Sequence, residues 1–256
     1  MVKEIDIPGE RIAKYLARAG ICSRREAEDL IVQGRVRVNG EIIDSPATFV
    51  SDADDIRVDS GKKIKKEIPR LFLFHKPVGL LTATKDPRGR PTIFDVMPRT
   101  MPRVVSVGRL DMNTEGLILL TNDGEIKRYL ELPSTGWVRS YRVRVHGTVN
   151  VDRLDKLKKG MVVKSVKYGP VIAKLEKAQQ SANSWVQLSL TEGKNREVRN
   201  LMKAIHLDVN RLIRTSYGPF QLGKLPRGAI IEVKTKALRE QLPKALVDKI
   251  FGVGEK

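Results

Sequence analysis

The side chains best placed for chemistry lie in the segment from Val107 to Gly124. Asp111 occupies a short polar loop between two apolar runs, and Arg109 precedes it by two positions. A carboxylate beside a cation in such a loop is available for reaction. Aspartate is also a common turn residue that hydrogen-bonds its own backbone. The residues alone leave both interpretations of Asp111 open.

Two further candidates occupy regular elements. Tyr141 lies in an alternating strand, where a core aromatic is the alternative to a functional residue. Arg199 falls on a helix expected over 196–205, which has an apolar face and a basic stripe. That stripe contains Arg196, Arg199 and Lys203, and a solvated charged surface is the alternative interpretation of it.

Several other kinds of site are excluded or not expected. The chain has one cysteine and three widely spaced histidines, so an internal disulfide is excluded and a zinc site is not expected. The run 218–224 resembles a P-loop, but Leu225 lacks the hydroxyl that would bind Mg²⁺. No segment has the roughly 20 apolar residues of a membrane span, and the cysteine content suits a reducing compartment. We therefore expect a cytoplasmic protein without a metal.

The charge is large and unevenly distributed. The 256 residues have a formal net charge of +18, with an isoelectric point of about 10.1. Residues 1–60 hold 9 basic and 12 acidic side chains, whereas residues 61–256 carry a net charge of +21. This excess indicates a polyanionic partner, because lysine and arginine contacts to phosphate dominate nucleic-acid affinity. The abrupt change in charge also indicates two modules.

The sequence of the first module predicts two helices followed by a hairpin. Helical spacing of apolar residues predicts a helix over 10–19. Ser23 and Glu26 form a capping box, which opens a second helix. The pair Asn39-Gly40 tolerates the positive φ angles of a type I′ turn and therefore predicts a hairpin over 35–43.

The second module mixes strands and helices. The expected strands are 71–74, 104–107, 117–121, 139–145, 171–177, 185–190, 210–215 and 230–233. The expected helices are 125–131, 151–158, 196–205 and a helix from 236 onward. Alternating strands among irregularly placed helices favour an α+β fold with a largely antiparallel sheet. We assign the modules to residues 8–59 and 70–250, joined by a linker over 60–69.

The first module resembles the S4 RNA-binding domain over about residues 8–56. The resemblance rests on the order helix, helix and Asn-Gly hairpin, with the run 23–28 leading into 34–40. It implies recognition of structured RNA through the surfaces of the two helices. The basic residues expected there are Arg11, Lys14, Arg18, Arg24 and Arg25.

The second module resembles the RsuA/RluB family of pseudouridine synthases over about residues 70–235. Its motifs occur in the family's order, at 76–79, 107–124, 140–143 and 192–199. The last motif, together with residues 211–219, looks closest to the branch that modifies large-subunit ribosomal RNA.

This resemblance implies an α+β enzyme that isomerises a uridine of ribosomal RNA to pseudouridine, with no cofactor or metal. Asp111 matches the family's nucleophile, and Tyr141 matches the tyrosine that stacks on the target base. Arg199 matches the arginine that forms an ion pair with the aspartate. Arg109 matches the arginine that fills the space left by the flipped uridine. The further RNA contacts expected in this module are Lys194 and Arg196.

The expected partner is structured ribosomal RNA or a ribosomal assembly particle, bound by a monomeric protein. The alternative is a non-catalytic S4-type RNA-binding factor of ribosome assembly, and a general basic nucleic-acid binder is a further alternative. The joint presence of Asp111, Tyr141 and Arg199 argues against the non-catalytic factor. The ordered set of motifs that accompanies the charge argues against the general binder.

Overall fold

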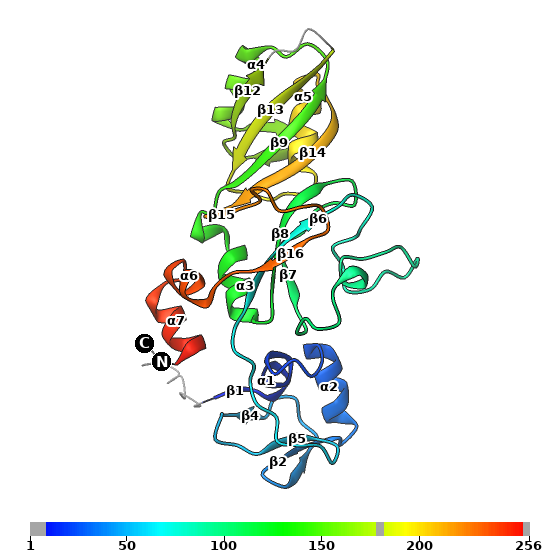
Figure 1. Ribbon diagram of the computed structural model, residues 1–256, viewed down its shortest axis with the longest axis vertical. Helices are drawn as coiled ribbons and strands as arrows, with labels where there is room; N and C mark the ends of the chain where they lie inside the picture. Colours follow the sequence, from blue (N-terminus) through cyan, green and yellow to red (C-terminus); the bar gives the residue numbers. More distant parts are fainter. Residues whose placement is uncertain (1–8, 178–181, 253–256) are drawn as a thin grey trace.

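The computed structural model describes residues 9–177 and 182–252. Three regions follow one another along the long axis of the molecule (Figure 1). The N-terminal unit lies at one end, and the two halves of a large sheet, each with its own helices, make up the rest. The sheet spans most of the C-terminal unit, residues 70–252.

The N-terminal unit has its own buried core beneath two helices. Its helices are α1 (Ile12–Arg18) and α2 (Arg24–Val32). Its strands are β1 (Glu10–Arg11), β2 (Val36–Val38), β3 (Glu41–Ile43), β4 (Phe49–Val50) and β5 (Ile56–Val58). Side chains from these elements form one cluster, in which Ile12, Leu16 and Ile31 are fully buried. Ile64, which follows the last strand, completes the cluster.

The capping box and the hairpin predicted from the sequence are both confirmed. The Ser23 hydroxyl accepts a hydrogen bond from the Glu26 amide at 3.2 Å, and the Glu26 carboxylate accepts one from the Ser23 amide at 2.7 Å. Asn39 and Gly40 have φ angles of 53° and 92° and join β2 to β3. Asparagine and glycine adopt this left-handed region at little cost, which explains the tight turn.

The C-terminal unit is built on a nine-stranded sheet. Its main path contains β12 (Ile172–Lys177), β13 (Asn183–Leu190), β9 (Arg139–His146), β14 (Asp208–Tyr217), β8 (Glu115–Thr121), β6 (Leu71–Lys76) and β16 (Ile230–Glu232), in that order. The strands β15 (Phe220–Gln221) and β7 (Val105–Val107) pair with β14 and β8. Of the pairings in this sheet, β14–β8 is parallel and the others are antiparallel. The predicted α+β class is confirmed.

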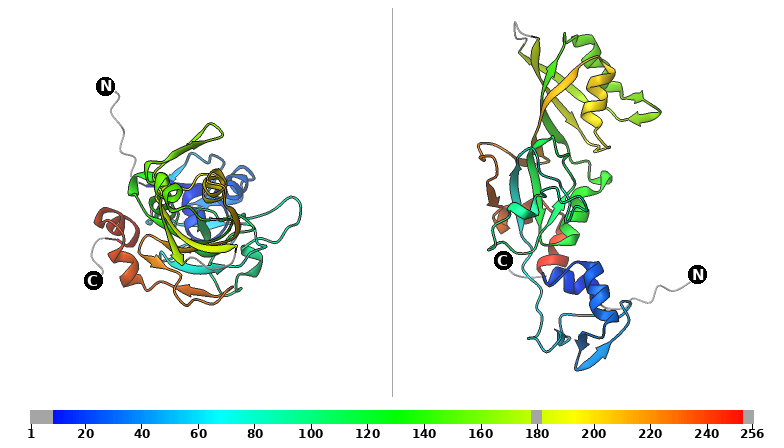
Figure 2. Two further views of the ribbon diagram at one scale, coloured as in Figure 1. Left: turned by 90° about the horizontal axis from the view of Figure 1, so that it is seen from above. Right: turned by 90° about the vertical axis from the view of Figure 1, so that its right-hand side faces the viewer.

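Helices cover the two halves of the sheet separately, as Figures 1 and 2 show. The outer half packs against α4 (Val151–Lys156) and α5 (Glu197–Ala204). The inner half packs against α3 (Gly124–Glu131), α6 (Thr235–Glu240) and α7 (Lys244–Phe251). A two-stranded hairpin, β10 (Met161–Val163) and β11 (Val166–Tyr168), lies beside α5. Short 3-10 helices occur at Phe94–Val96, Pro133–Thr135 and Leu157–Lys159.

Some predicted boundaries were wrong. Glu10 and Arg11 pair with β4 as a short strand, so the first helix begins at Ile12. The single helix expected from 236 onward is two helices, because Pro243 interrupts the backbone hydrogen bonds and becomes the N-cap of α7. The strands β4, β5, β10, β11 and β15 were not predicted, since two or three residues give too short a period to detect.

Candidate active site

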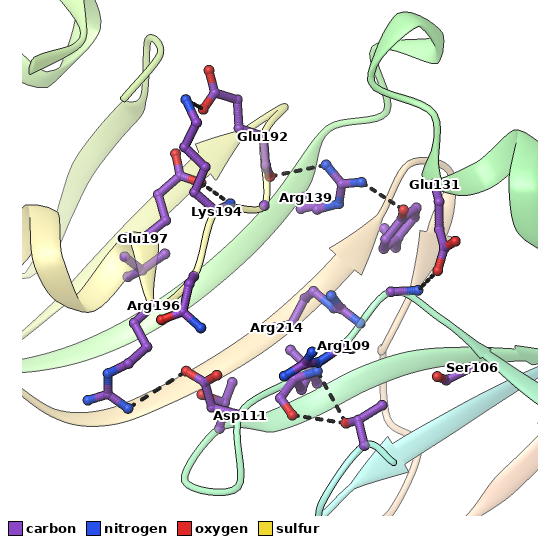
Figure 3. A pocket seen from close by; sticks show the side chains of 18 of the residues that line it. Ser106, Arg109, Asp111, Glu131, Arg139, Glu192, Lys194, Arg196, Glu197 and Arg214 are labelled. Atoms are coloured by element: carbon purple, nitrogen blue, oxygen red, sulfur yellow. Dashed lines mark hydrogen bonds and ion pairs between the residues drawn. The ribbon is translucent and has the colours of Figure 1, made fainter. Parts of the chain in front are cut away.

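A cavity of about 970 Å³ opens where the two halves of the sheet meet (Figure 3). Its walls come from the loop between β7 and β8, from β9 and β14, and from the loop at residues 191–196. Asp111, Tyr141, Arg109, Lys194 and Arg196 line it, so the structure brings five of the predicted site residues together.

Asp111 lies in the turn between β7 and β8. The Thr114 amide donates to the Asp111 carbonyl at 3.0 Å, which closes the turn. The Thr82 hydroxyl donates to the Leu110 carbonyl at 2.9 Å and accepts from the Leu110 amide at 3.2 Å. Gly108, just before the loop, has a φ of +66°, which a side chain would strain. These backbone contacts fix the position from which the carboxylate extends.

Lys76 holds the backbone of this loop, a role that was not predicted from the sequence. The side chain is fully buried at the end of β6. Its ammonium donates to the carbonyls of Pro77, Asp111, Met112 and Thr114 at 3.0, 3.2, 3.4 and 2.9 Å. Burial lowers the pKa of Lys76 to about 8, although the negative charges of Asp111 and Glu115 oppose the shift. The available signals for this residue were its place at the end of an apolar strand and in the motif at 76–79, and neither indicates which atoms it contacts.

The ion-pair partner of Asp111 differs from the predicted one. Arg196 Nη1 lies 3.9 Å from Asp111 Oδ2 and forms the ion pair found for this carboxylate among the described residues. Arg199 instead donates to the carbonyls of Val209 at 3.1 Å and Asn113 at 2.8 Å. The cause is the start of α5: Arg196 has a left-handed φ of 50° and caps the helix, so its side chain turns toward the loop.

Arg199 still affects the electrostatics of the loop. Burial lowers the pKa of its guanidinium, the neighbouring Arg196 lowers it further, and Asp111 opposes both. Through its bond to the Asn113 carbonyl, Arg199 joins α5 to the turn that carries Asp111. The structure therefore gives it a contact with the loop backbone, and gives Arg196 the contact with the carboxylate.

Tyr141 and Arg109 lie on the cavity wall in different environments. Tyr141 is 8% exposed and extends from β9 into the cavity. It is directly opposite Arg214 of the neighbouring strand β14. Arg109 is exposed, two residues before Asp111 and at the cavity mouth. An aromatic ring and an exposed guanidinium thus line the same cavity as Asp111.

A second group of wall residues holds the loop at 191–196, and the sequence did not reveal it. Arg139 donates to the carbonyls of Thr191 and Glu192 at 2.6 and 3.1 Å, and to the Tyr217 hydroxyl at 2.8 Å. Arg214 is 2% exposed and donates to the Leu117 carbonyl at 2.7 Å. These bonds connect β9, β14 and β8 around the cavity.

Helix α3 links the cavity to the N-terminal unit. At its C-terminal end, Glu131 accepts hydrogen bonds from the Gly108 amide at 2.6 Å and from Lys127 at 2.5 Å. At its N-terminal end, Lys14 donates to Glu125 at 2.5 Å and Arg18 donates to Asp123 at 3.1 Å. Although burial opposes it, the hydrogen bonds from Lys14 and Lys249 lower the pKa of Glu125 to about 2.

This contact corrects part of the RNA-binding prediction for α1. Lys14 and Arg18 are occupied in ion pairs with α3, and the Arg18 side chain is only 12% exposed, so these two residues hold the units together. Arg11, Arg24 and Arg25 are exposed and are not among the residues with an ion pair in the described part of the chain.

Neither a metal cluster nor a membrane-spanning helix is found in the described part of the chain. No group of three or more His, Cys, Asp or Glu side chains within it could hold a metal ion. No helix among residues 9–177 and 182–252 is long and apolar enough to cross a bilayer.

Comparisons with known proteins agree with the resemblance described above. The model of the RNA pseudouridylate synthase family matches residues 70–204, and the S4 domain model matches residues 10–56. An uncharacterized RNA pseudouridine synthase of Rickettsia felis is 44% identical over 90% of this chain and 100% of its own length. Ribosomal large subunit pseudouridine synthase B of Yersinia pestis is 42% identical over 90% of this chain and 74% of its own length.

A solved structure described as a pseudouridylate synthase extends the likeness to the fold. It superimposes with a TM-score of 0.63 at 26% identity, over 91% of this chain and 99% of its own. The predicted family is therefore confirmed. The chain belongs to the RNA pseudouridylate synthase family and is an RNA pseudouridine synthase, an isomerase with an S4 domain ahead of its catalytic part.

Proposed function

We propose that this enzyme converts a uridine of large-subunit ribosomal RNA to pseudouridine, with Asp111 as the nucleophile. The observation that carries the proposal is the Asp111 carboxylate in a cavity, with Arg196 3.9 Å away and its own loop fixed by Lys76. The RNA target is supported by the relatives of Yersinia pestis and Salmonella typhi, both named ribosomal large subunit pseudouridine synthase B and both 42% identical.

The reaction needs no group beyond the protein and the RNA. The bond between C1′ and N1 breaks, the freed uracil rotates, and a bond between C1′ and C5 forms. The proton on C5 leaves and N1 gains one, so atoms and electrons balance without an oxidant or hydrolysis. A carboxylate promotes the first step either by attack or by assisting departure of the base. We infer no metal or cofactor site from this chemistry.

The cavity residues have separate proposed roles. Tyr141 stacks on the flipped base and is placed to move a proton, and Arg109 occupies the gap that the base leaves in the RNA stack. Arg196 forms an ion pair with the Asp111 carboxylate and orients it toward the base. Arg199 positions the Asn113 backbone of the same turn and adds a second cation. Lys194 contributes a further phosphate contact at the rim.

The remaining parts of the proposal concern the RNA. Exposed Arg11, Arg24 and Arg25 contact structured RNA, either free or in a ribosomal particle, and the protein acts as a monomer in the cytoplasm. The units proposed at residues 8–59 and 70–250, with a linker over 60–69, are supported by the change in charge and by two separate buried cores, although Ile64 of the linker packs in the first core.

Mapping of modified bases tests the proposed target. Large-subunit ribosomal RNA from cells lacking the protein is compared with RNA from normal cells after chemical derivatisation, because pseudouridine and uridine have the same mass. We expect one or a few sites to lose modification, and the purified enzyme to restore them in unmodified transcript. Loss confined to small-subunit RNA, or to transfer RNA, would reject the large-subunit target.

A further inference from the structure

A lysine-rich segment lies beside the cavity and has no part in the reaction described above. Residues 156–167 contain five lysines and no acidic residue. The segment runs from the end of α4 through the hairpin of β10 and β11. The hairpin projects from the outer half of the molecule in the right-hand view of Figure 2. We call residues 156–168 the lysine hairpin.

The cations of the lysine hairpin face solvent. All five lysines are exposed: Lys156, Lys158, Lys159, Lys164 and Lys167. Lys158 forms an ion pair with Asp155 at 2.6 Å, in which both side chains are more than half exposed. Among the residues that the structure describes, the other four lysines have no carboxylate at ion-pair distance. Cations on one short segment repel one another, and a polyanion would relieve that repulsion.

The backbone of the hairpin is fixed against the body of the protein. Met161 and Val163 pack on the main core, and the buried Tyr168 accepts a hydrogen bond from Asn200 of α5 at 2.9 Å. Gly160 has a φ of +71°, and a Cβ there would lie 2.5 Å from the Tyr168 carbonyl, so the strands require glycine at this point. Lys164 lies in the two-residue turn at the tip. The lysines therefore extend from a rigid support.

The lysine hairpin continues directly from the cavity rim. Lys194, which lines the cavity, donates to the Lys167 carbonyl at 2.6 Å. Gly169, just after the hairpin, packs so closely on the cavity residue Glu192 that a Cβ would lie 2.4 Å from its carboxylate. An RNA strand entering the cavity past Lys194 and Arg196 thus has the hairpin lysines next to it.

We propose that the lysine hairpin binds the phosphate backbone of the RNA that flanks the target uridine. This inference rests on the proposed ribosomal RNA substrate. Lysine is a point charge that contacts phosphate without reading the bases, so the hairpin contributes affinity and orientation and does not select the uridine. Each phosphate contact also releases counterions, which makes the contribution sensitive to salt.

A matched pair of triple variants tests the proposal. One carries Lys159→Gln, Lys164→Gln and Lys167→Gln in the hairpin. The control carries Lys234→Gln, Lys236→Gln and Lys244→Gln, three exposed lysines near the C-terminal helices, and has the same net charge. The Michaelis constant and kcat are measured by tritium release from large-subunit transcript labelled at C5 of uridine, between 50 and 200 mM KCl. Anisotropy of a labelled RNA stem-loop measures binding without turnover.

We expect the hairpin variant to raise KM at least tenfold with kcat unchanged, and the control to change KM less than threefold. The slope of log affinity against log salt should become shallower by about 0.7 to 0.9 for each lysine that contacts a phosphate. Replacing the same three lysines with arginine should restore KM. Equal effects of the two triple variants, or a loss of kcat alone, would overturn the proposal. Absence of turnover in the wild type would reject the proposed function, while the anisotropy comparison would still test the hairpin.

Discussion

The buried Lys76 behind the Asp111 turn and the cations of the cavity rim carry the same charge in opposite environments. Lys76 does not line the cavity: it is fully buried and donates to four backbone carbonyls, so its position is set when the protein folds. At the rim, Arg109, Lys194 and Arg196 line the cavity and are exposed. The buried cation holds the backbone that carries Asp111, whereas the exposed cations are accessible to RNA. Substitution of Lys76 should therefore affect kcat and stability, and substitution of the exposed cations should affect activity or RNA binding without loss of stability.

Removal of the buried cation Lys76 is expected to have the largest effect. Lys76→Met leaves buried carbonyls of the Asp111 turn without donors, which should lower the free energy of unfolding by about 3 kcal/mol. The turn would also relax, so kcat should fall at least 100-fold. Chemical denaturation and single-turnover tritium release measure the two effects.

Lys127→Met is the matched control for this substitution. Lys127 also donates to a backbone carbonyl, that of Ser106 at 2.6 Å, but its side chain is 35% exposed. Its loss should cost no more than about 1 kcal/mol. Equal losses of stability and kcat in the two variants would show that burial of Lys76 is not what fixes the loop.

The pH dependence of kcat and of the free energy of unfolding distinguishes the effect of Lys76 on the reaction from its effect on stability. Because its pKa in the folded protein is about 8, we expect kcat to fall as the pH rises above 8 and the cation beneath Asp111 is lost. The unfolded chain keeps this proton to near the ordinary value of 10.5, so the unfolded state binds more protons between those values. The contribution of Lys76 to the free energy of unfolding should therefore rise with pH, while kcat falls. Denaturation of wild type and Lys76→Met across this range checks the sign, and a parallel decline of both quantities would contradict it.

Variants of Arg196 and Arg199 compare a cation that contacts the Asp111 carboxylate with one that contacts the backbone of its loop. Arg199→Leu removes donors to the Val209 and Asn113 carbonyls, so we expect lower kcat together with a loss of about 1 to 2 kcal/mol of stability. Arg196→Leu should lower kcat/KM with no change in the thermal transition, since its side chain is half exposed. Loss of stability in Arg196→Leu but not in Arg199→Leu would reverse the assignment.

The sequence predicted the parts of the fold that depend on local chemistry. The capping box at Ser23 and the turn at Asn39-Gly40 act within a few residues, and the structure contains both. The long strands β8 and β9 also have clear apolar patterns. The short strands β10 and β11 have no detectable alternation of their own and form by pairing with each other, so they were missed.

The sequence predicted which residues form the candidate site better than it predicted the contacts among them. The family resemblance predicted Asp111, Tyr141 and Arg199 as the catalytic group and Arg196 as an RNA contact; Asp111, Tyr141 and Arg196 line one cavity, whereas Arg199 contacts the backbone beside it. It could not show that Arg196 would adopt a left-handed conformation and displace Arg199 from the carboxylate. Likewise, the stripe on α1 could not reveal that Lys14 would pair with Glu125, 111 residues later in the chain. Such choices between nearby cations depend on tertiary packing.

The helices of the N-terminal unit offer a smaller version of the same comparison. Lys14 and Arg18 are paired with α3, so Lys14→Met with Arg18→Met should lower the thermal transition by a few degrees and leave the salt dependence of RNA binding unchanged. Arg24→Gln with Arg25→Gln should weaken binding a few-fold, with a shallower salt slope and no change in the thermal transition. Filter binding and calorimetry distinguish these outcomes, and a changed salt slope in the first pair would restore α1 as an RNA surface.

The reactivity of the Asp111 carboxylate is the most direct test of the account. Asp111→Asn keeps the backbone carbonyl that Lys76 holds and removes the negative charge, so the fold should be preserved. Single-turnover release of tritium from C5-labelled uridine in large-subunit transcript is compared with the wild type, alongside thermal unfolding and RNA binding. The account predicts no release above background, with an unchanged thermal transition and RNA affinity within a few-fold of the wild type. Release at a rate near that of the wild type would contradict it.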